Sequence, residues 1–272
     1  MAIIAREVTS TQAFLSALGV RKLPALTSPF DPGYAPSEIE SHLAQSGHLM
    51  ATLKLSMACW QIANEPASRA KIAAAHAAGV EVTTGGGPFE VAVARGLFGE
   101  YLELCAEMGF DRIECGEGFT TLQDSPQAVV DRARAAGLQV QYELGPKHEG
   151  PITNETIEEL VTIGARWLDA GAVQLVIEAR ESAADVGLFD AQGRLSSELA
   201  ERLADRFGLD TVTFEAPNKA SQFAFMSLFG PEVRLSNVRI EELLRVEIYR
   251  RGLHSDAFQQ PNLTPPDGVP SA

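Results

Sequence analysis

Short apolar runs alternate with longer amphipathic or alanine-rich segments along almost the whole chain. The short runs have the length and composition of buried strands, and the longer segments have the spacing of helices. We expect strands at residues 25–31, 50–56, 80–84, 112–116, 139–144, 173–179, 211–215 and 234–237. We expect helices at residues 10–18, from 37 onward, 66–78, 89–96, 101–108, 126–136, 154–170, 197–207, 219–229 and 240–250.

This alternation predicts an α/β fold, because parallel neighbouring strands need a crossover connection that is usually a helix. The count of strands favours a single-domain (β/α)8 TIM barrel with parallel strands over residues 1–256, including an N-terminal helix. A chain of 272 residues suits such a barrel, which typically needs about 250. A doubly wound open sheet is the alternative, but its G-x-G-x-x-G turn is missing. Residues 257–272 are rich in proline and polar residues and predict a disordered tail.

Acidic residues stand near the ends of five of the predicted strands. They are Asp31, Glu114 with Glu117, Glu143, Glu178 and Glu215. A carboxylate within an apolar run is costly to bury unless it meets a cation or a hydrogen-bond donor. Barrel enzymes place their catalytic groups at the C-terminal ends of the strands, which all face one pocket. The repeated pattern therefore predicts one shared site.

A lysine in the second predicted strand is a further candidate for this site. Lys54 shares one face of the strand with Thr52 and Ser56, because side chains alternate along a strand. Lysine is rarely buried without a partner or a chemical role. Lys54 is therefore either a catalytic residue or the ion-pair partner of one of the glutamates, and the spacing leaves both interpretations open.

Other cations and a glycine-rich turn are expected on the same rim. Lys147, Arg180 and Lys219 follow the fifth, sixth and seventh predicted strands. Gly85 and Gly86 belong to the segment TTGGGPFE, which leads from a strand into a helix. Free backbone N–H groups in such a turn suit a phosphate or a carboxylate. The same glycines are also explained by a tight turn that needs positive φ.

Carboxylates and cations that converge in this way favour Mg²⁺ together with a small anionic substrate. Magnesium prefers oxygen ligands, usually one or two carboxylates with waters and substrate oxygens. The histidines are too scattered to predict a zinc site. There is no G-x-S-x-G nucleophile elbow and no P-loop. Cys115, next to Glu114 in a strand, is better explained as a packed thiol than as a nucleophile.

The composition narrows the classes of partner. A net charge of −14 argues against nucleic-acid binding, which needs a basic face, but it leaves a small anion possible as substrate. No apolar stretch approaches the roughly 18 residues of a membrane helix, so no membrane partner is expected. The first residues do not resemble a signal peptide, and three cysteines without zinc-like spacing predict reduced thiols. We therefore expect a cytoplasmic protein, and we expect it to form a homo-oligomer.

Long stretches of the chain resemble the phosphosulfolactate synthase family over about residues 26–256. The most specific are GGGPFEVAVARGLFGEYLELCAEMGFDRIE, VIEARES followed by GLFDAQGRL, and FEAPNKASQFAFM, after which come LSNV and RRGLHSD. The resemblance implies a (β/α)8 barrel lyase that uses Mg²⁺ to add sulfite to phosphoenolpyruvate. The product would be (2R)-phospho-3-sulfolactate, which begins one route to coenzyme M in methanogens.

The resemblance also implies roles for individual residues. Lys54, Lys147 and Arg180 would be catalytic, and either lysine could protonate the carbon next to the site of sulfite attack. The metal would be held among the glutamates of the strand ends. These are Glu114, Glu143, Glu178 and Glu215. Substrate contacts would come from Asp31, Gly85, Gly86, Glu181, Ser182, Lys219 and Asn237.

The chain departs from the family at several places near the expected anion pocket. Pro32 stands where the family has the lysine of Asp-Lys-Gly, and Pro146 replaces the first of two lysines. LSMACW replaces Phe-Gly-Trp-Gly-Thr after Lys54, and Gly-Glu-Gly at 116–118 replaces Ser-Asp-Gly. Two alternatives follow: a related enzyme with another donor or nucleophile, and a non-catalytic protein like the plant heat-stress-associated branch of the family. The retained strand-end charges favour an enzyme, since idle buried charges are costly.

Overall fold

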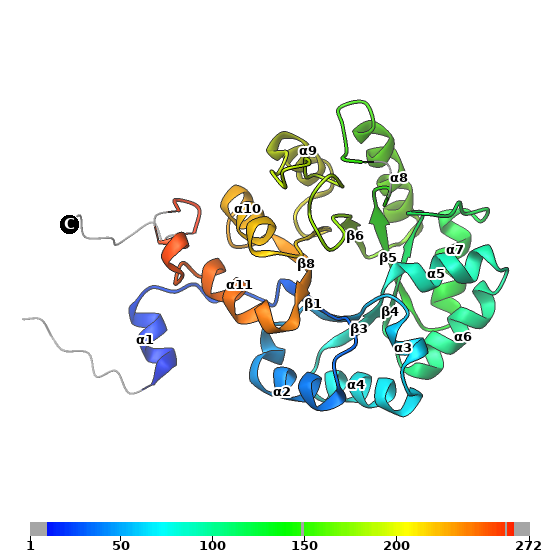
Figure 1. Ribbon diagram of the computed structural model, residues 1–272, viewed down its shortest axis with the longest axis horizontal. Helices are drawn as coiled ribbons and strands as arrows, with labels where there is room; N and C mark the ends of the chain where they lie inside the picture. The colour runs from blue at the N-terminus through cyan, green and yellow to red at the C-terminus, as the bar shows by residue number, and fades with distance from the viewer. Residues whose placement is uncertain (1–9, 148–149, 259, 264–272) are drawn as a thin grey trace, which may run out of the picture.

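The computed structural model describes residues 10–147, 150–258 and 260–263, and in them eight parallel strands close into a barrel in chain order. Each strand is hydrogen-bonded to the next, and the last returns to the first (Figure 1). The strands are β1 (Thr27–Asp31), β2 (Thr52–Leu55), β3 (Glu81–Thr84), β4 (Arg112–Gly116), β5 (Gln139–Leu144), β6 (Gln174–Ile177), β7 (Val212–Glu215) and β8 (Arg234–Arg239). The predicted single-domain (β/α)8 barrel is confirmed.

Helices connect the strands and surround the barrel in Figure 1. The α-helices are α1 (Thr11–Ala17), α2 (Pro36–Ser46), α3 (Cys59–Ile62), α4 (Glu65–Ala77), α5 (Gly86–Ala94), α6 (Phe98–Met108), α7 (Pro126–Ala135), α8 (Ile157–Ala170), α9 (Ser197–Phe207), α10 (Lys219–Phe229) and α11 (Leu243–Arg250). Short 3₁₀ turns are η1 (Gly47–Leu49), η2 (Ile240–Glu242) and η3 (Ser255–Ala257). The N-terminal helix α1 lies to one side of the barrel and buries none of its residues.

The sequence predicted most element boundaries to within a few residues, and α9 and α10 to the residue. Helix α2 begins before Ser37, because Pro36 occupies its first turn and the Glu38 carboxylate accepts the Ala35 N–H at 2.8 Å. The last predicted helix starts as the 3₁₀ turn η2. Helix α3 was not predicted; it is a single turn that buries only Trp60 and carries no periodic pattern.

The hydrophobic core lies between the strands and the helices. Leu53, Val82, Ile113 and Phe214 point outward from their strands and are fully buried. Aromatic pairs join the two layers: Tyr142 of β5 stacks on Trp167 of α8 at 4.2 Å, and Phe214 stacks on Phe225 of α10 at 4.6 Å. Because one face of every strand packs on helices, the other face must fill the barrel interior.

That interior is polar, whereas a TIM barrel is usually filled by bulky branched side chains. The inward face is shown by Lys54 of β2, which reaches carboxylates of β4 and β7 across the barrel. Alternation and strand register place the following side chains on the same face: Ser28, Thr52, Thr83, Arg112, Gln141, Glu143, Thr213, Arg234 and Ser236. Buried polar groups need partners, so the interior is the place to look for bound ligands.

The start of the expected disordered tail packs on the barrel. Ala257 and Leu263 are buried, and the Asn262 amide donates to the Ser227 carbonyl at 2.8 Å. For residues 264–272 that expectation lies outside the described residues. Within the described part of the chain, no helix is both long enough and apolar enough to cross a membrane.

Candidate active site

Three glutamates from neighbouring strands converge at the C-terminal mouth of the barrel. Glu143 ends β5, Glu178 follows β6 and Glu215 ends β7, and carboxylate oxygens of all three lie within 4.8 Å of one another. All three side chains are buried. We call Glu143, Glu178 and Glu215 the carboxylate cluster. Its close packing needs Gly187, because a Cβ there would lie 1.8 Å from the Glu178 carbonyl oxygen.

Lys54 forms the floor of the site together with Glu114. Its Nζ lies 2.8 Å from Glu114 Oε1 and 3.4 Å from Glu215 Oε1, and its side chain is only 5% exposed. Glu114 also accepts hydrogen bonds from the Gly86 N–H at 2.9 Å and from Gln141 Nε2 at 2.7 Å. The ion-pair interpretation of Lys54 therefore describes its contacts. Its catalytic role and the metal-binding role of Glu114 stay predictions.

Lys147 lies above the cluster and nearer to solvent. Its Nζ contacts Glu143 Oε1 at 2.6 Å and Glu178 Oε2 at 2.5 Å, and its side chain is 20% exposed. Gly118 leaves the room that this side chain needs, since a Cβ at that position would lie 2.6 Å from Lys147 Cε. Of the two lysines, Lys147 is the one that a ligand entering from the mouth would meet first.

The pKa values of Glu178 and Glu143 are shifted in opposite directions. Burial and the neighbouring carboxylates of Glu143 and Glu215 raise the pKa of Glu178 to about 11. Burial would also raise the pKa of Glu143, but Lys147 and a hydrogen bond from Glu178 lower it to about 2. Burial disfavours both lysine ammonium groups, yet the carboxylates outweigh it and raise the pKa of Lys54 and of Lys147. Both lysines are therefore charged at neutral pH, and Glu178 is the member of the carboxylate cluster that retains a proton most readily.

This proton predicts a pH-dependent stability for the metal-free protein. A glutamate in the unfolded chain titrates near about 4.3, so above that pH unfolding releases the Glu178 proton. The free energy of unfolding should then fall between pH 5 and 9 by up to about 1.4 kcal/mol per pH unit. Glu114, whose pKa burial also raises, acts in the same direction as Glu178. Glu143 acts in the opposite direction only below about pH 4.3, and lysines titrate above this window. Glu178→Gln should flatten the slope in thermal melts, whereas the exposed control Glu103→Gln should not; equal slopes would contradict the assignment.

Backbone N–H groups after β6 and a side-chain amide of β8 donate hydrogen bonds to the carboxylate cluster. The Arg180 N–H donates to Glu178 Oε1 at 2.6 Å and to Glu215 Oε2 at 3.2 Å, and the Ala179 N–H donates to Glu215 at 2.9 Å. Asn237 on β8 donates its amide to Glu215, while its buried Oδ1 has no hydrogen-bond partner among the described residues. Arg180 and Asn237 both adopt positive φ, an unusual backbone state that tends to occur at functional sites. The Arg180 guanidinium also donates to the Lys147 carbonyl at 3.2 Å.

Residues 22–256 of this chain match the (2R)-phospho-3-sulfolactate synthase (ComA) family. The chain belongs to this family. It is 32% identical over 234 residues to the phosphosulfolactate synthase of Methanocaldococcus jannaschii, covering 86% of this chain and 93% of that protein. It is 27% identical over 241 residues to the phosphosulfolactate synthase of Methanothermobacter thermautotrophicus, covering 88% and 93%.

Among solved structures, the YdjI aldolase from Escherichia coli K12 aligns with a TM-score of 0.52 at 12% identity, covering 90% of this chain and 93% of that one. At that identity the likeness supports only the barrel fold. The family resemblance inferred from the sequence is thus confirmed by relatives that span nearly the whole barrel.

Asp31 has an ion-pair partner that the family resemblance does not predict. Its carboxylate bonds to Lys71 of α4 at 2.6 Å and to the N–H groups of Gly33 and Tyr34. Lys71 is buried and was missed, because its place in an alanine-rich helix gave no signal. The ion pair supplies a cation near the strand end where Pro32 replaces the family's lysine. Within the described residues, no hydrogen bond or ion pair joins Asp31 to the carboxylate cluster.

Three further candidates lie on the rim, outside the cluster. Lys219 pairs with Asp256 at 2.9 Å, and both side chains are exposed. Glu181 is exposed, and the exposed Ser182 hydroxyl donates to the Ala184 carbonyl at 3.4 Å. The structure does not bring these three into contact with the cluster, and their role in substrate binding stays a prediction.

The glycine-rich turn packs directly against the site. A Cβ at Gly85 would lie 2.8 Å from the Met57 nitrogen, and one at Gly86 would lie 3.0 Å from Glu143 Oε2. The Gly86 N–H, in the first turn of α5, donates to Glu114. The turn therefore holds a protein carboxylate at the start of a helix, where a negative charge is favoured. Whether it also binds a substrate anion stays a prediction.

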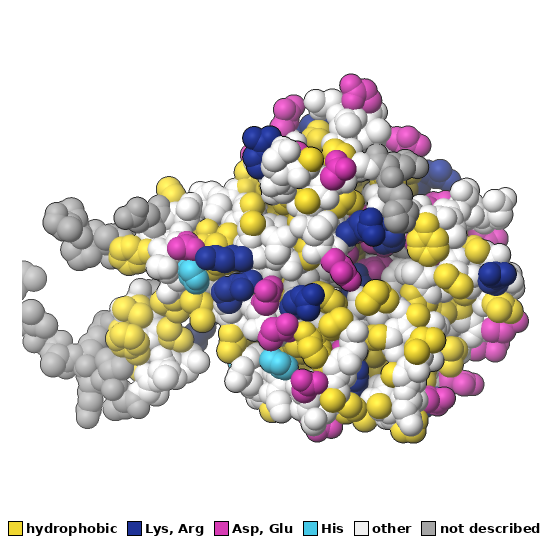
Figure 2. Space-filling model, in the orientation of Figure 1, with side chains coloured by type: hydrophobic (Ala, Val, Ile, Leu, Met, Phe, Trp, Pro, Cys, Tyr) yellow, Lys and Arg dark blue, Asp and Glu magenta, His cyan; other side chains and the backbone are white. Residues whose placement is uncertain are grey.

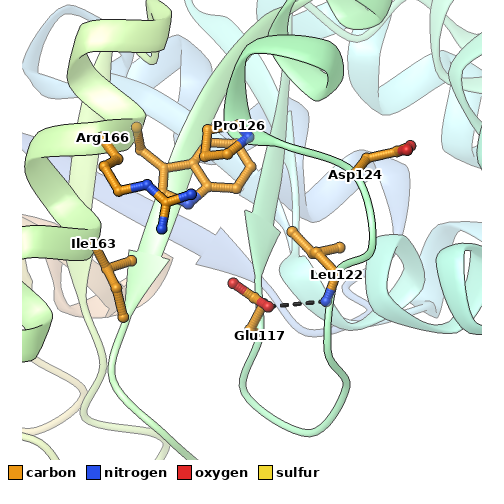
Figure 3. A pocket seen from close by; sticks show the side chains of 7 residues that line it. Glu117, Leu122, Asp124, Pro126, Ile163 and Arg166 are labelled. Carbon is orange, nitrogen blue, oxygen red and sulfur yellow. Dashed lines mark hydrogen bonds between the residues drawn. The ribbon is translucent and has the colours of Figure 1, made fainter.

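A side pocket opens next to Glu143, between β5 and α8. Its volume is about 300 Å³, and its lining includes Tyr142, Pro146 and Ile152. Glu117 lines both this pocket and a smaller one of about 140 Å³, shown in Figure 3. Its carboxylate accepts from the Leu122 N–H at 2.9 Å and from the Tyr142 hydroxyl at 3.0 Å, so it belongs to these pockets and not to the cluster.

Lys and Arg side chains are mixed with Asp and Glu on the face seen in Figure 2, without one continuous basic surface. This distribution follows from a chain that carries 22 basic and 36 acidic residues. Three of the basic residues are buried within the described part of the chain: Lys54, Lys71 and Arg250.

Proposed function

We propose that this chain is a Mg²⁺-dependent phosphosulfolactate synthase, a lyase that adds sulfite to phosphoenolpyruvate to give (2R)-phospho-3-sulfolactate. The observation that carries the proposal is the carboxylate cluster interleaved with two lysines at the C-terminal mouth of the barrel. Membership of the family supports the choice of reaction. As part of the same proposal, the enzyme works in the cytoplasm and as a homo-oligomer.

The residues of the cluster fit a hard divalent cation. Three carboxylates offer oxygen ligands of the kind Mg²⁺ prefers. Asn237 Oδ1, buried beside Glu215 and lacking a hydrogen-bond partner, is suited to be a further oxygen ligand. The raised pKa of Glu178 reflects its burial and the neighbouring carboxylates of Glu143 and Glu215, whose negative charge a cation would offset. When bound, Mg²⁺ would supply positive charge to stabilise an enolate-like carboxylate.

The chain's own cations would do the remaining chemistry. Arg180, at the mouth, would attract the carboxylate and phosphate of phosphoenolpyruvate. Sulfite would form a C–S bond with the methylene carbon, and the electrons of the double bond would move to the adjacent carbon and its carboxylate. Lys147 would then donate a proton to that adjacent carbon. Lys147 suits this role because it is charged at neutral pH and lies nearest to the opening, above the more deeply buried Lys54.

Direct product detection tests the proposal. Purified protein would be incubated with Mg²⁺, phosphoenolpyruvate and sulfite, and phosphosulfolactate would be measured by mass spectrometry. We expect product that depends on all three components. Absence of product together with absence of any Mg²⁺-dependent binding of phosphoenolpyruvate would overturn the proposal and favour the non-catalytic alternative.

Binding of Mg²⁺ should depend on Glu178 and on pH. The ion must displace the Glu178 proton, so its affinity should rise by up to about tenfold per pH unit between pH 6 and 9. The increase in melting temperature that Mg²⁺ causes in the wild type should disappear in Glu178→Gln and persist in Glu103→Gln. A pH-independent affinity, or an unchanged response in Glu178→Gln, would place the metal elsewhere.

One observation favours a second candidate, a related enzyme with a nucleophile other than sulfite. The described lining of the side pocket next to Glu143 contains no lysine or arginine, and it includes Pro146 where the family has lysine. A volume of about 300 Å³ without cations suits a larger, less charged group better than sulfite. Mg²⁺-dependent stabilisation by phosphoenolpyruvate without sulfite addition would support this candidate over the first.

A further inference from the structure

The opposite, N-terminal mouth of the barrel contains a second polar pocket. Its volume is about 460 Å³, and its lining includes Arg112 at the start of β4 and Arg234 at the start of β8. Hydroxyl groups of Ser28, Thr52 and Thr213 line the same space. We call this the N-terminal pocket. Two arginines at one mouth are notable in a chain with 22 basic residues against 36 acidic ones.

The two arginines of the N-terminal pocket are unequally paired with the two acids that line it, Glu81 and Asp210. Arg112 pairs with Glu81 at 2.9 Å, whereas no ion pair to Arg234 is found among the described residues. Nε of each arginine is buried and has no hydrogen-bond partner in the described part of the chain. Burial, with a contribution from Arg234, lowers the pKa of Arg112 although Glu81 opposes the shift. Both arginines line the same pocket.

Buried hydroxyls in and above the pocket also lack partners. Thr213 is only 2% exposed and lines the pocket, yet its Oγ1 makes no hydrogen bond. Ser236, one step further into the barrel on β8, has a buried Oγ in the same condition. Asp210 is the acidic residue that lines the pocket with Glu81. Buried polar groups normally have a partner, so these arginine and hydroxyl groups leave hydrogen-bonding capacity for a bound ligand.

We propose that the N-terminal pocket binds a small inorganic tetrahedral oxyanion, sulfate or phosphate, between Arg112 and Arg234. Such an anion supplies several acceptor oxygens at once and accepts charge-assisted hydrogen bonds from guanidinium groups and hydroxyls. It offers acceptor oxygens to Nε of both arginines and to the Thr213 hydroxyl, and its negative charge faces two guanidinium groups that line one pocket. The pocket is larger than one anion, so water shares it.

Hydrogen bonds connect this site to the floor of the candidate active site. The Arg112 guanidinium donates to Gln141 Oε1 at 3.3 Å, and Gln141 Nε2 donates to Glu114 at 2.7 Å. Glu114 in turn holds Lys54 at 2.8 Å. An anion that draws Arg112 toward itself therefore acts on Gln141, whose side chain is two hydrogen bonds away from Lys54.

Thermal melts with sulfate test the proposal. Melting temperatures of metal-free protein would be measured in sodium sulfate and in sodium chloride at matched ionic strength. Sulfate also stabilises proteins non-specifically, and the exposed control Arg95→Gln reports that general effect. We expect Arg95→Gln to behave as the wild type and Arg234→Gln to show an apparent sulfate affinity at least tenfold weaker.

Crystals soaked in selenate would locate the anion by its anomalous scattering. Density between Arg112 and Arg234 in the wild type, absent in Arg234→Gln, is the expected result. Density confined to the C-terminal mouth would overturn the proposal, as would equal sulfate responses in Arg234→Gln and Arg95→Gln. A loss of melting temperature in Arg234→Gln that is the same in chloride and in sulfate would show a structural arginine and would also overturn it.

Discussion

Replacing Lys147 with methionine is expected to lower turnover of the proposed reaction by about 10²–10⁴-fold, the range that a positioned general acid contributes. Methionine keeps the length of the side chain and removes the ammonium group that contacts Glu143 and Glu178. Rates at saturating phosphoenolpyruvate, sulfite and Mg²⁺ measure the effect on kcat. The loss should lie mainly in kcat, because the proton is needed only after the substrates have bound.

The exposed lysine Lys22 provides the matched control, and Lys22→Met should leave turnover unchanged. Lys54→Met should also reduce turnover, but with a greater loss of stability, because it leaves Glu114 and Glu215 buried without their cation. Turnover of Lys147→Met equal to that of Lys22→Met would contradict the role. Thermal unfolding of each variant shows whether loss of fold accounts for loss of rate.

Replacing Arg250 with methionine is expected to lower the free energy of unfolding by about 3–5 kcal/mol, as for other broken buried ion pairs. Arg250 on α11 is fully buried and pairs with Glu247 at 3.1 Å. Its guanidinium also donates to the carbonyls of Pro231 and Val233 at 2.6 and 2.7 Å and to the Thr27 hydroxyl at 3.0 Å. The side chain thereby joins the last helix to the segment before β8 and to β1, where the barrel closes. Urea denaturation measures the change.

The double variant Glu247→Gln/Arg250→Met separates the buried charge from the lost hydrogen bonds. Because Glu247 also pairs with Arg251, comparing the double variant with Arg250→Met shows how far Arg251 alone compensates the buried carboxylate. A loss below about 1 kcal/mol in Arg250→Met would mean that the network adds little to stability, as for exposed ion pairs.

The sequence alone determined the barrel fold and showed that the acidic residues lie at the C-terminal ends of its strands. Alternating short apolar runs and helical segments leave parallel strands with helical crossovers as the consistent arrangement. In such a fold every strand ends at the same mouth, so Glu143, Glu178 and Glu215 had to lie near one another. Periodicity also set α9 and α10, whereas α3 is too short for any pattern and exists because Trp60 packs in the core.

The tertiary structure decided which charge meets which. Side chains that face the interior of a closed barrel can reach any other strand, so sequence spacing could not tell that Lys54 spans Glu114 and Glu215 or that Lys147 joins Glu143 to Glu178. The pairing of Asp31 with Lys71 depends on the packing of α4 against the barrel. The placement of Arg112 and Arg234 in one pocket at the other mouth depends on strand register around the whole barrel. Residues that are far apart in the chain come to line the same space only when the barrel closes.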